Sequence, residues 1–186
     1  MEEAINKALE VLRNGGIILY PTDTVWGIGC DATNDTAVNR IYEIKRRNDN
    51  KSMLVLLDSV AKLDRYVNDI PDLAYDLIEM SEKPITIIYE KSMGLSPNIS
   101  KANETVGIRV TNEAFSKRLI ERFKKPIVST SANISGEANP ASFLEISEEI
   151  KAAVDYVVEY RQNGEKAKPS SIIMLGNSGE IKVIRE

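Results

Sequence analysis

Hydroxyl, basic and carboxylate side chains are the groups in this sequence that could do chemistry, because the usual catalytic bases are missing. The 186 residues include no histidine and one cysteine, Cys30. This composition excludes a Ser-His-Asp triad, a Cys-His pair, histidine-ligated metals and an intrachain disulfide. The sequence also has no C-x-x-C pair, so we expect no metal site formed by protein ligands. Any reaction must depend on Lys, Arg, Asp, Glu, hydroxyls and backbone amides.

Three polar clusters follow apolar segments of the chain. They are the turn Thr22-Asp23-Thr24, a basic corner with Lys45, Arg47 and Lys51, and the hydroxyl-rich run from Ser129 to Ser135. In proteins with a sheet and helices, the loops at the ends of strands are the usual place where a ligand site is assembled. The three clusters are therefore candidates for one common site.

Each cluster has a chemical and a purely structural interpretation. The basic corner suits an oligophosphate, because a guanidinium binds two oxygens and an ammonium acts as a point charge. It would serve equally well as a favourable cationic end of a helix. The hydroxyl run suits a sugar or a carboxylate, but hydroxyls also cap loops, and the Thr-Asp-Thr turn can be explained in the same way. The residues alone leave both interpretations open.

Apolar runs with strand or helix spacing must position these clusters. Predicted strands cover residues 17–20, 53–57, 85–89, 106–110, 127–128 and 156–160, and a predicted hairpin joins 172–175 to 181–184. Helices are predicted over 5–12, from 34 or 35 to 44, over 71–78, from a cap at Asn112 to 123, and from a capping box at Ser142. Strands and helices alternate without strict βαβ order. This pattern predicts an α/β (mixed, α+β-like) fold, a mixed sheet with helices on its faces.

The overall composition is that of a globular protein, with 42% hydrophobic and 28% charged residues. A formal net charge of −4 argues against a wholly basic nucleic-acid-binding domain, although it permits a local basic patch. The acidic start of the chain is unlike a signal peptide, and no window reaches the ~18 apolar residues of a membrane span. We therefore expect one domain over residues 1–186, a cytoplasmic location and no contact with a membrane.

Six short motifs follow one another along nearly the whole chain. They are Pro21-Thr22-Asp23-Thr24-Val25-Trp26-Gly27, Lys45-x-Arg47, Gly107-x-Arg109-Val110, Ser131-Ala132-Asn133-x-Ser135-Gly136, Ser170-Ser171-Ile172 and Val183-Ile184-Arg185. Together they resemble the motif set of the YrdC-like family, the threonylcarbamoyl-AMP synthases. The resemblance implies a single three-layer domain whose twisted sheet mixes parallel and antiparallel strands. It also implies a reaction in which L-threonine, bicarbonate and ATP give threonylcarbamoyl-AMP and pyrophosphate.

The resemblance further implies roles for individual residues. Lys45 and Arg47 would be catalytic, because placed cations stabilise the negative charge that develops when a carboxylate attacks the α-phosphorus. The L-threonine pocket would comprise Thr24, Arg109, Ser129 and one of Ser170 and Ser171, with Arg109 pairing with the substrate carboxylate. The ATP site would comprise Arg47, Lys51, Thr105, Ser131, Asn133, Asn139 and Arg185. Mg²⁺ would be carried by the ATP phosphates, since this ion keeps several waters and needs few protein ligands.

Several alternatives stay open. Arg109 could form a structural ion pair with Asp23 or Glu104 instead of binding a substrate. The fold could also be an RNA-binding module without turnover, or a module that transfers a carbamoyl group from carbamoyl phosphate, as in hydrogenase maturation proteins. In the synthase interpretation, the product group reaches tRNA directly or through downstream threonylcarbamoyl-transfer proteins. The chain departs from common family motifs at Asn48 and Thr111, where proline is usual, and this puts the borrowed loop geometry in doubt.

Overall fold

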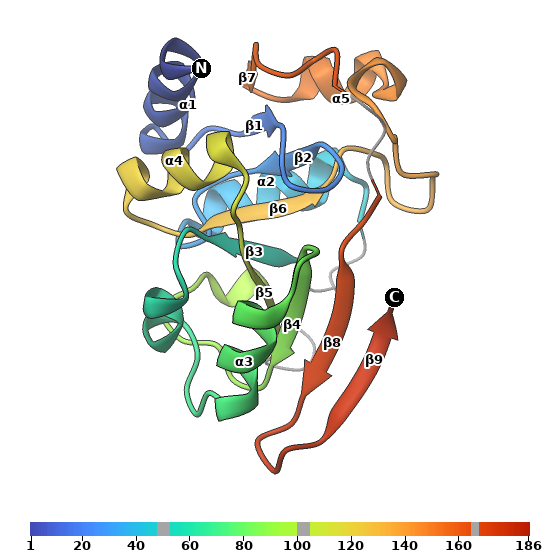
Figure 1. Cartoon of the computed structure of the whole chain (residues 1–186). Helices are drawn as coiled ribbons and strands as arrows, with labels where there is room; N and C mark the ends of the chain where they lie inside the picture. Colours follow the sequence, from blue (N-terminus) through green and yellow to red (C-terminus); the bar gives the residue numbers. More distant parts are fainter. Residues whose placement is uncertain (48–52, 100–104, 165–167) are drawn as a thin grey trace.

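One mixed sheet runs through the computed structural model, which describes residues 1–47, 53–99, 105–164 and 168–186 (Figure 1). In sheet order the strands are β7 (Tyr156–Val157), β1 (Ile18–Tyr20), β2 (Gly27–Gly29), β6 (Ile127–Ser131), β3 (Leu54–Leu57), β5 (Val106–Val110), β4 (Ile85–Tyr89), β8 (Ser171–Leu175) and β9 (Ile181–Arg185). Strand β3 is parallel to β5, β4 to β8 and β1 to β7, whereas the other neighbours are antiparallel. The expected mixed sheet is confirmed.

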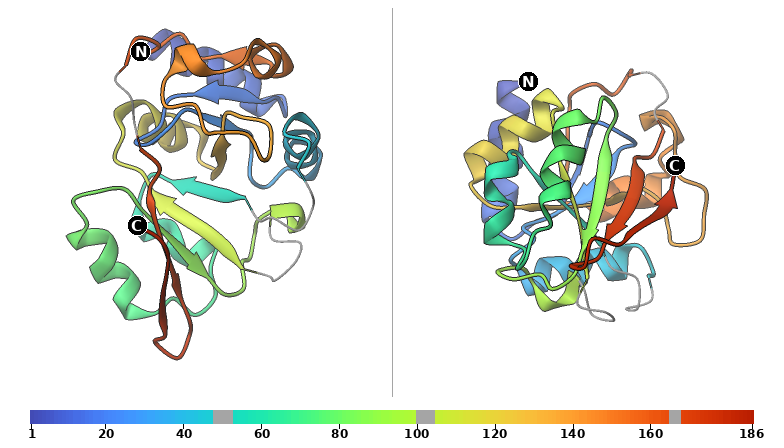
Figure 2. Two further views of the ribbon diagram at one scale, coloured as in Figure 1. Left: turned by 90° about the vertical axis from the view of Figure 1, so that its right-hand side faces the viewer. Right: turned by 60° about the horizontal axis from the view of Figure 1, so that its bottom comes forward.

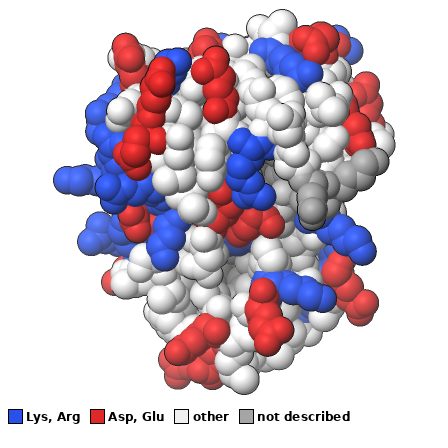
Figure 3. Space-filling view, turned by 45° about the horizontal axis from the view of Figure 1, so that its top comes forward, with Lys and Arg blue, Asp and Glu red and all other residues white. Residues whose placement is uncertain are grey.

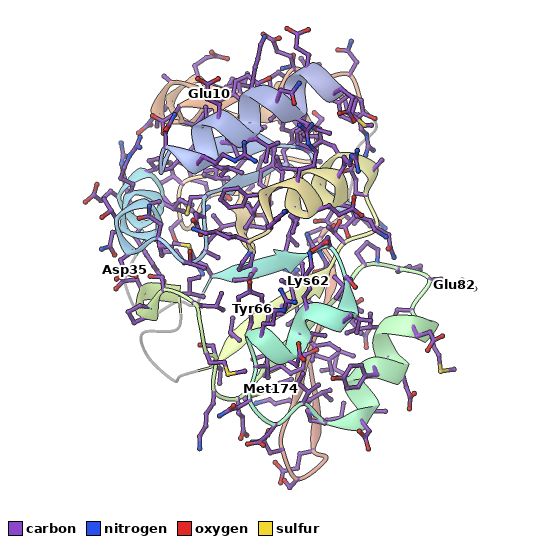
Figure 4. All side chains as sticks on the ribbon, turned by 90° about the vertical axis from the view of Figure 1, so that its left-hand side faces the viewer. Glu10, Asp35, Lys62, Tyr66, Glu82 and Met174 are labelled. Atoms are coloured by element: carbon purple, nitrogen blue, oxygen red, sulfur yellow. The ribbon has the colours of Figure 1, made fainter. Side chains whose placement is uncertain are left out.

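Helices pack on this sheet through the apolar faces that the sequence predicts. They are α1 (Glu2–Arg13), α2 (Asp35–Ile44), α3 (Asp72–Met80), α4 (Ala114–Phe123) and α5 (Glu148–Ala153), with 3₁₀ turns η1 (Val60–Arg65), η2 (Pro97–Ile99) and η3 (Phe143–Glu145). Helices α1 and α4 lie side by side, and the left panel of Figure 2 shows them behind the strands. Ile5 and Leu9 of α1 are buried, whereas Glu10 lies on the outer side of the helix (Figure 4). Burial of such apolar surface is the main favourable term in folding.

Strand β2 has no counterpart among the predicted strands. Two of its three residues are glycines, so it has too few side chains to show an alternating pattern. A Cβ at Gly29 would lie 2.5 Å from the carbonyl oxygen of Val128, and glycine therefore permits the close approach of β2 and β6.

The starts of two helices differ from the prediction. Glu113, not Asn112, caps α4, because its Oε2 accepts a hydrogen bond from the backbone N–H of Ser116 at 2.7 Å. Helix α5 follows Ser147, whose Oγ accepts from the N–H of Ile150 at 3.3 Å, whereas Ser142 leads into η3 without a side-chain cap. Neighbouring polar residues have similar capping propensities, and the packing of the helix decides between them.

The strand register brings the polar clusters together. Ser129 of β6 pairs with Leu54 at the start of β3, and Ser131 pairs with Gly27 at the start of β2. Leu54 pairs on its other side with Gly107 of β5, two residues before Arg109. Because side chains two residues apart in a strand share a face, this register places Arg109 and the hydroxyl run near the Thr-Asp-Thr turn.

Candidate active site

A cavity of about 220 Å³ opens where the polar clusters meet. Its lining comes from the Thr-Asp-Thr turn and β2, the end of α2, and strands β3, β5, β6, β8 and β9. The lining residues are Thr24, Val25, Trp26, Gly27, Arg47, Met53, Leu54, Arg109, Ser129, Thr130, Ser131, Asn139, Pro169, Ser170, Ile172 and Arg185. Segments from both ends of the chain therefore build one polar cavity.

The end of α2 separates the three consecutive basic side chains Lys45, Arg46 and Arg47. Arg46 has a left-handed φ of 47°. Its N–H bonds to the carbonyl of Glu43, and the N–H of Arg47 bonds to the carbonyl of Tyr42, each at 3.0 Å. This is the Schellman motif, which ends a helix and turns the chain. Consequently Lys45 is buried, Arg46 is exposed and bonded to Glu149 at 2.5 Å, and Arg47 lines the cavity.

Lys45 lies behind the cavity wall rather than on it. Its Nζ donates hydrogen bonds to the carbonyl oxygens of Ser131 at 2.5 Å and Asn133 at 2.6 Å, and lies 3.4 Å from Asn133 Oδ1. The backbone carbonyl of Lys45 accepts from the N–H of Ser135 at 2.8 Å. Burial and the positive charge of Arg47 lower the pKa of Lys45 to about 7, whereas its three oxygen contacts match the three N–H bonds of the ammonium form. Lys45 thus fixes the hydroxyl run on the end of α2.

Arg109 combines a buried ion pair with a place on the cavity wall. It is 2% exposed, and its Nη2 lies 3.0 Å from Asp23 Oδ1. Within the described residues, neither this oxygen nor Arg109 Nε has a hydrogen-bond partner, so the pair is close without being fully satisfied. Burial lowers the pKa of Arg109, and the charge of Asp23 opposes that shift. The structural ion pair foreseen as an alternative is therefore present, and Glu104, the other acid considered, lies outside the described residues.

Arg185 approaches the same cavity from β9. Its Nε donates to the carbonyl oxygen of Ser170 at 2.9 Å, and burial and the charge of Arg109 lower its pKa. The cavity lining thus contains three arginines, Arg47, Arg109 and Arg185. No Asp or Glu is among the described residues that line the cavity. Three like charges without a carboxylate on the wall favour an anionic ligand, because an anion would relieve their mutual repulsion.

Comparison with known proteins identifies the family of this chain. The family model Sua5_yciO_yrdC, described as telomere recombination, matches residues 10–186. This chain belongs to the Sua5/YciO/YrdC family. It is 34% identical over 174 residues to the threonylcarbamoyl-AMP synthase of Pseudoalteromonas translucida, covering 92% of each chain. The resemblance found in the motifs is confirmed.

Two solved structures of the family have the same fold. P. abyssi Sua5 in complex with L-threonine superposes with a TM-score of 0.84 at 28% identity, over 94% of this chain and 52% of that one. E. coli YciO superposes with a TM-score of 0.85 at 26% identity, over 100% of this chain and 90% of that one. This chain therefore spans about half of the P. abyssi chain and nearly all of the E. coli one.

Most of the residues that the family motifs suggested meet in the cavity, but some do not. Thr24, Arg47, Arg109, Ser129, Ser131, Asn139, Ser170 and Arg185 line it. Ser171 lines a different cavity with Met80 and Glu82, because successive side chains of a strand point to opposite faces. Of the two serines proposed for the threonine pocket, the structure brings Ser170 to the wall.

Two further residues of the expected ATP site lie elsewhere. Asn133 is buried behind the wall, where its Nδ2 donates to the carbonyls of Ile134 at 3.1 Å and Glu137 at 2.8 Å. Thr105 lines an adjoining cavity of about 180 Å³, which shares Met53, Leu54 and Ile172 with the first. Lys51 lies outside the described residues.

Trp26 and Thr130 line the cavity although neither was proposed as a ligand. The Trp26 ring packs on Phe143 with centroids 4.8 Å apart, and Thr130 Oγ1 lies 3.3 Å from Arg47 Nη1. Trp26 lies inside a motif that carries the family resemblance, and Thr130 lies inside the hydroxyl-rich run from Ser129 to Ser135; those positions were the available signals. The described residues contain no group of three or more His, Cys, Asp or Glu that could hold a metal ion. No described helix is long and apolar enough to cross a membrane.

Proposed function

We propose that this chain is a threonylcarbamoyl-AMP synthase, which converts L-threonine, bicarbonate and ATP to threonylcarbamoyl-AMP and pyrophosphate. The observation that carries the proposal is the cavity with three arginines, several hydroxyls and no carboxylate among its described lining residues. A substrate carboxylate and a triphosphate both need such cations. The full-length similarity to a protein named for this activity supports the same assignment.

The proposed chemistry needs no histidine. The amine of threonine and bicarbonate give a carbamate and water, and a carbamate oxygen then attacks the α-phosphorus of ATP. The new P–O bond forms as the bond between the α-phosphorus and the bridging oxygen breaks, and pyrophosphate leaves. Mg²⁺ carried by the ATP phosphates would supply further charge stabilisation. Arg47 and Arg185 stabilise the charge on the phosphates, while Arg109 holds the carboxylate of threonine. Lys45 contributes by positioning the hydroxyl run and not by touching substrate.

The adjoining cavity extends the proposed site for ATP. Of its lining residues, Met53, Leu54, Ile88 and Ile172 are apolar, and Thr86 and Thr105 add hydroxyl groups. A largely apolar recess with a few polar groups suits a nucleobase. We place the phosphates beside Arg47 and the base towards Thr105.

The first test is a pyrophosphate-release assay with the purified chain. Release is expected to require threonine, bicarbonate and ATP together, because the carbamate must form before it attacks. Omission of either threonine or bicarbonate should reduce the rate to the background of ATP hydrolysis. Release that continues without threonine, or turnover of carbamoyl phosphate in place of bicarbonate, would contradict the proposal and favour the transferase alternative.

The adjacent arginines at the end of α2 provide a matched pair for testing phosphate binding. Arg47→Ala is expected to weaken a non-hydrolysable ATP analogue by about tenfold or more, since a charge-assisted contact is lost. Arg46→Ala should change the affinity less than about twofold, because an exposed ion pair contributes little. Isothermal titration of both variants decides the matter. Small and equal effects would indicate that the basic corner only stabilises the end of the helix and does not bind phosphate.

The distribution of surface charge bears on how the product reaches tRNA. Figure 3 shows Lys and Arg gathered at the left-hand edge of the view, on the side where α1 and α4 lie in Figure 1. On α4 and just after it, two cations are paired: Arg122 lies 3.2 Å from Glu2, and Lys125 lies 2.6 Å from Asp31. Such pairing reduces the positive potential that RNA would need. We therefore propose that downstream proteins transfer the threonylcarbamoyl group to tRNA.

A further inference from the structure

The hydroxyl of Thr22 uses all of its hydrogen-bonding capacity inside the turn before β2. Its Oγ1 donates to the carbonyl oxygen of Val25 at 2.8 Å and accepts from the backbone N–H of Thr24 at 3.0 Å. It also lies 3.1 Å from Oγ1 of Thr24. A carbonyl oxygen accepts only and a backbone N–H donates only, so the direction of the first two bonds is fixed.

These directions determine where the Thr24 proton lies. A hydroxyl has one proton and two acceptor sites, and the Thr22 proton is already directed to Val25. In the contact between the two hydroxyls, Thr24 must therefore be the donor. The hydrogen bond that Thr24 Oγ1 donates then fills the second acceptor site of Thr22 Oγ1. Thr24 is left with lone pairs only, and Thr24 is the member of the pair that lines the cavity.

We propose that Thr22 is a positioning residue that fixes the Thr24 proton away from the cavity and makes Thr24 an obligatory acceptor. The inference rests on the proposed function, because the group that Thr24 then selects is the amino group of the substrate. Arg109, also on the wall, presents only donors and suits the carboxylate. Together the two residues recognise an amino acid, because Thr24 accepts a hydrogen bond from its amino group and Arg109 donates to its carboxylate.

Burial keeps this proton arrangement in place. Thr22 is 4% exposed and Thr24 is 9% exposed, so little water is available to offer Thr22 another donor or to release the Thr24 proton. A carbonyl, carboxylate or phosphate oxygen placed against Thr24 would face lone pairs without a proton between them. Such a ligand is rejected because buried polar groups are left unpaired.

The test compares two ligands of the same carbon skeleton that differ at C2, the position we expect to face Thr24. L-2-aminobutanoate presents a donor there, and 2-oxobutanoate presents an acceptor. Isothermal titration of the wild-type chain should show a preference for the amino acid of about a hundredfold. Thr22→Val removes the acceptor and frees the Thr24 proton to turn to the ligand, so the preference should fall by about tenfold. Thr22→Ser keeps the hydroxyl and should keep the preference.

The ratio of the two affinities separates this role from a general loss of structure, which would lower both affinities together. An unchanged ratio in Thr22→Val would overturn the inference. If that variant does not fold, Thr24→Val replaces it, and its preference for the amino acid should also fall by at least about tenfold. A retained preference in Thr24→Val would equally overturn the inference. Failure of the wild-type chain to bind L-threonine in the same instrument would instead overturn the proposed function, and this inference with it.

Discussion

Arg109→Lys is expected to raise the KM for L-threonine by about ten- to a hundredfold while changing the KM for ATP less than about twofold. Lysine keeps a positive charge near Asp23 and can still compensate that half-buried carboxylate. It lacks the planar fork of the guanidinium, which lies 3.0 Å from Asp23 Oδ1 through Nη2 while Arg109 also lines the cavity. The loss should therefore fall on the amino acid, and steady-state kinetics with each substrate varied in turn would measure it.

Arg118→Lys is the matched control for this experiment. Arg118 lies on α4, 52% exposed, with Glu2 and Glu121 as partners, and it does not line the cavity. It should leave both KM values unchanged. If Arg109→Lys instead lowered thermal stability and left the KM for threonine alone, Arg109 would be a structural residue and the amino-acid pocket would be misplaced.

Lys45→Met is expected to lower the free energy of unfolding by about 2–4 kcal/mol and to reduce kcat/KM by more than about a hundredfold. Methionine fills similar space, but it leaves the carbonyl oxygens of Ser131 and Asn133 buried without the Lys45 ammonium. The hydroxyl run then loses its attachment to α2, and the cavity wall should move with it. The free energy of unfolding is measured by chemical denaturation, with the fluorescence of Trp26 as the signal, because this residue lines the same cavity.

Two further variants distinguish positioning from direct catalysis at Lys45. Lys45→Arg keeps a positive charge, but a planar guanidinium has the wrong shape for three closely spaced oxygens, so it should not restore activity. Lys7→Met removes an exposed lysine of α1 that pairs with the exposed Glu3, so it should cost much less, without loss of activity. A Lys45→Met protein with wild-type stability and no activity would show that Lys45 acts on the substrate itself.

Local sequence was sufficient for much of the fold. Apolar runs gave β3, β4, β5 and the hairpin of β8 and β9 to within a residue or two, because a buried strand needs such a run wherever it lies in the sheet. Of the two caps predicted for α2, Asn34 and Asp35, the structure uses Asn34, whose Oδ1 accepts from the N–H of Ala37 at 3.1 Å. The same reasoning missed β2 and misplaced the caps of α4 and α5. Those features depend on contacts with other parts of the chain.

The sequence by itself determined what chemistry is available to this protein. The absence of histidine and the presence of Lys, Arg and hydroxyl clusters restrict it to charge stabilisation, and the order of the motifs identified the family. These conclusions follow from residue type and sequence order, neither of which depends on how the chain folds.

Only the tertiary structure decided which of the candidate groups face the cavity. Lys45 and Arg47 belong to one motif, yet packing buries the first among carbonyl oxygens and leaves the second on the wall. Pairing of β8 with β4 brought Ser170, rather than Ser171, to the cavity. Asp23 became the partner of Arg109 through contacts between distant segments. Spacing fixes which side chains share a face, but long-range packing determines what covers that face, and burial then sets the charge and proton arrangement of the site.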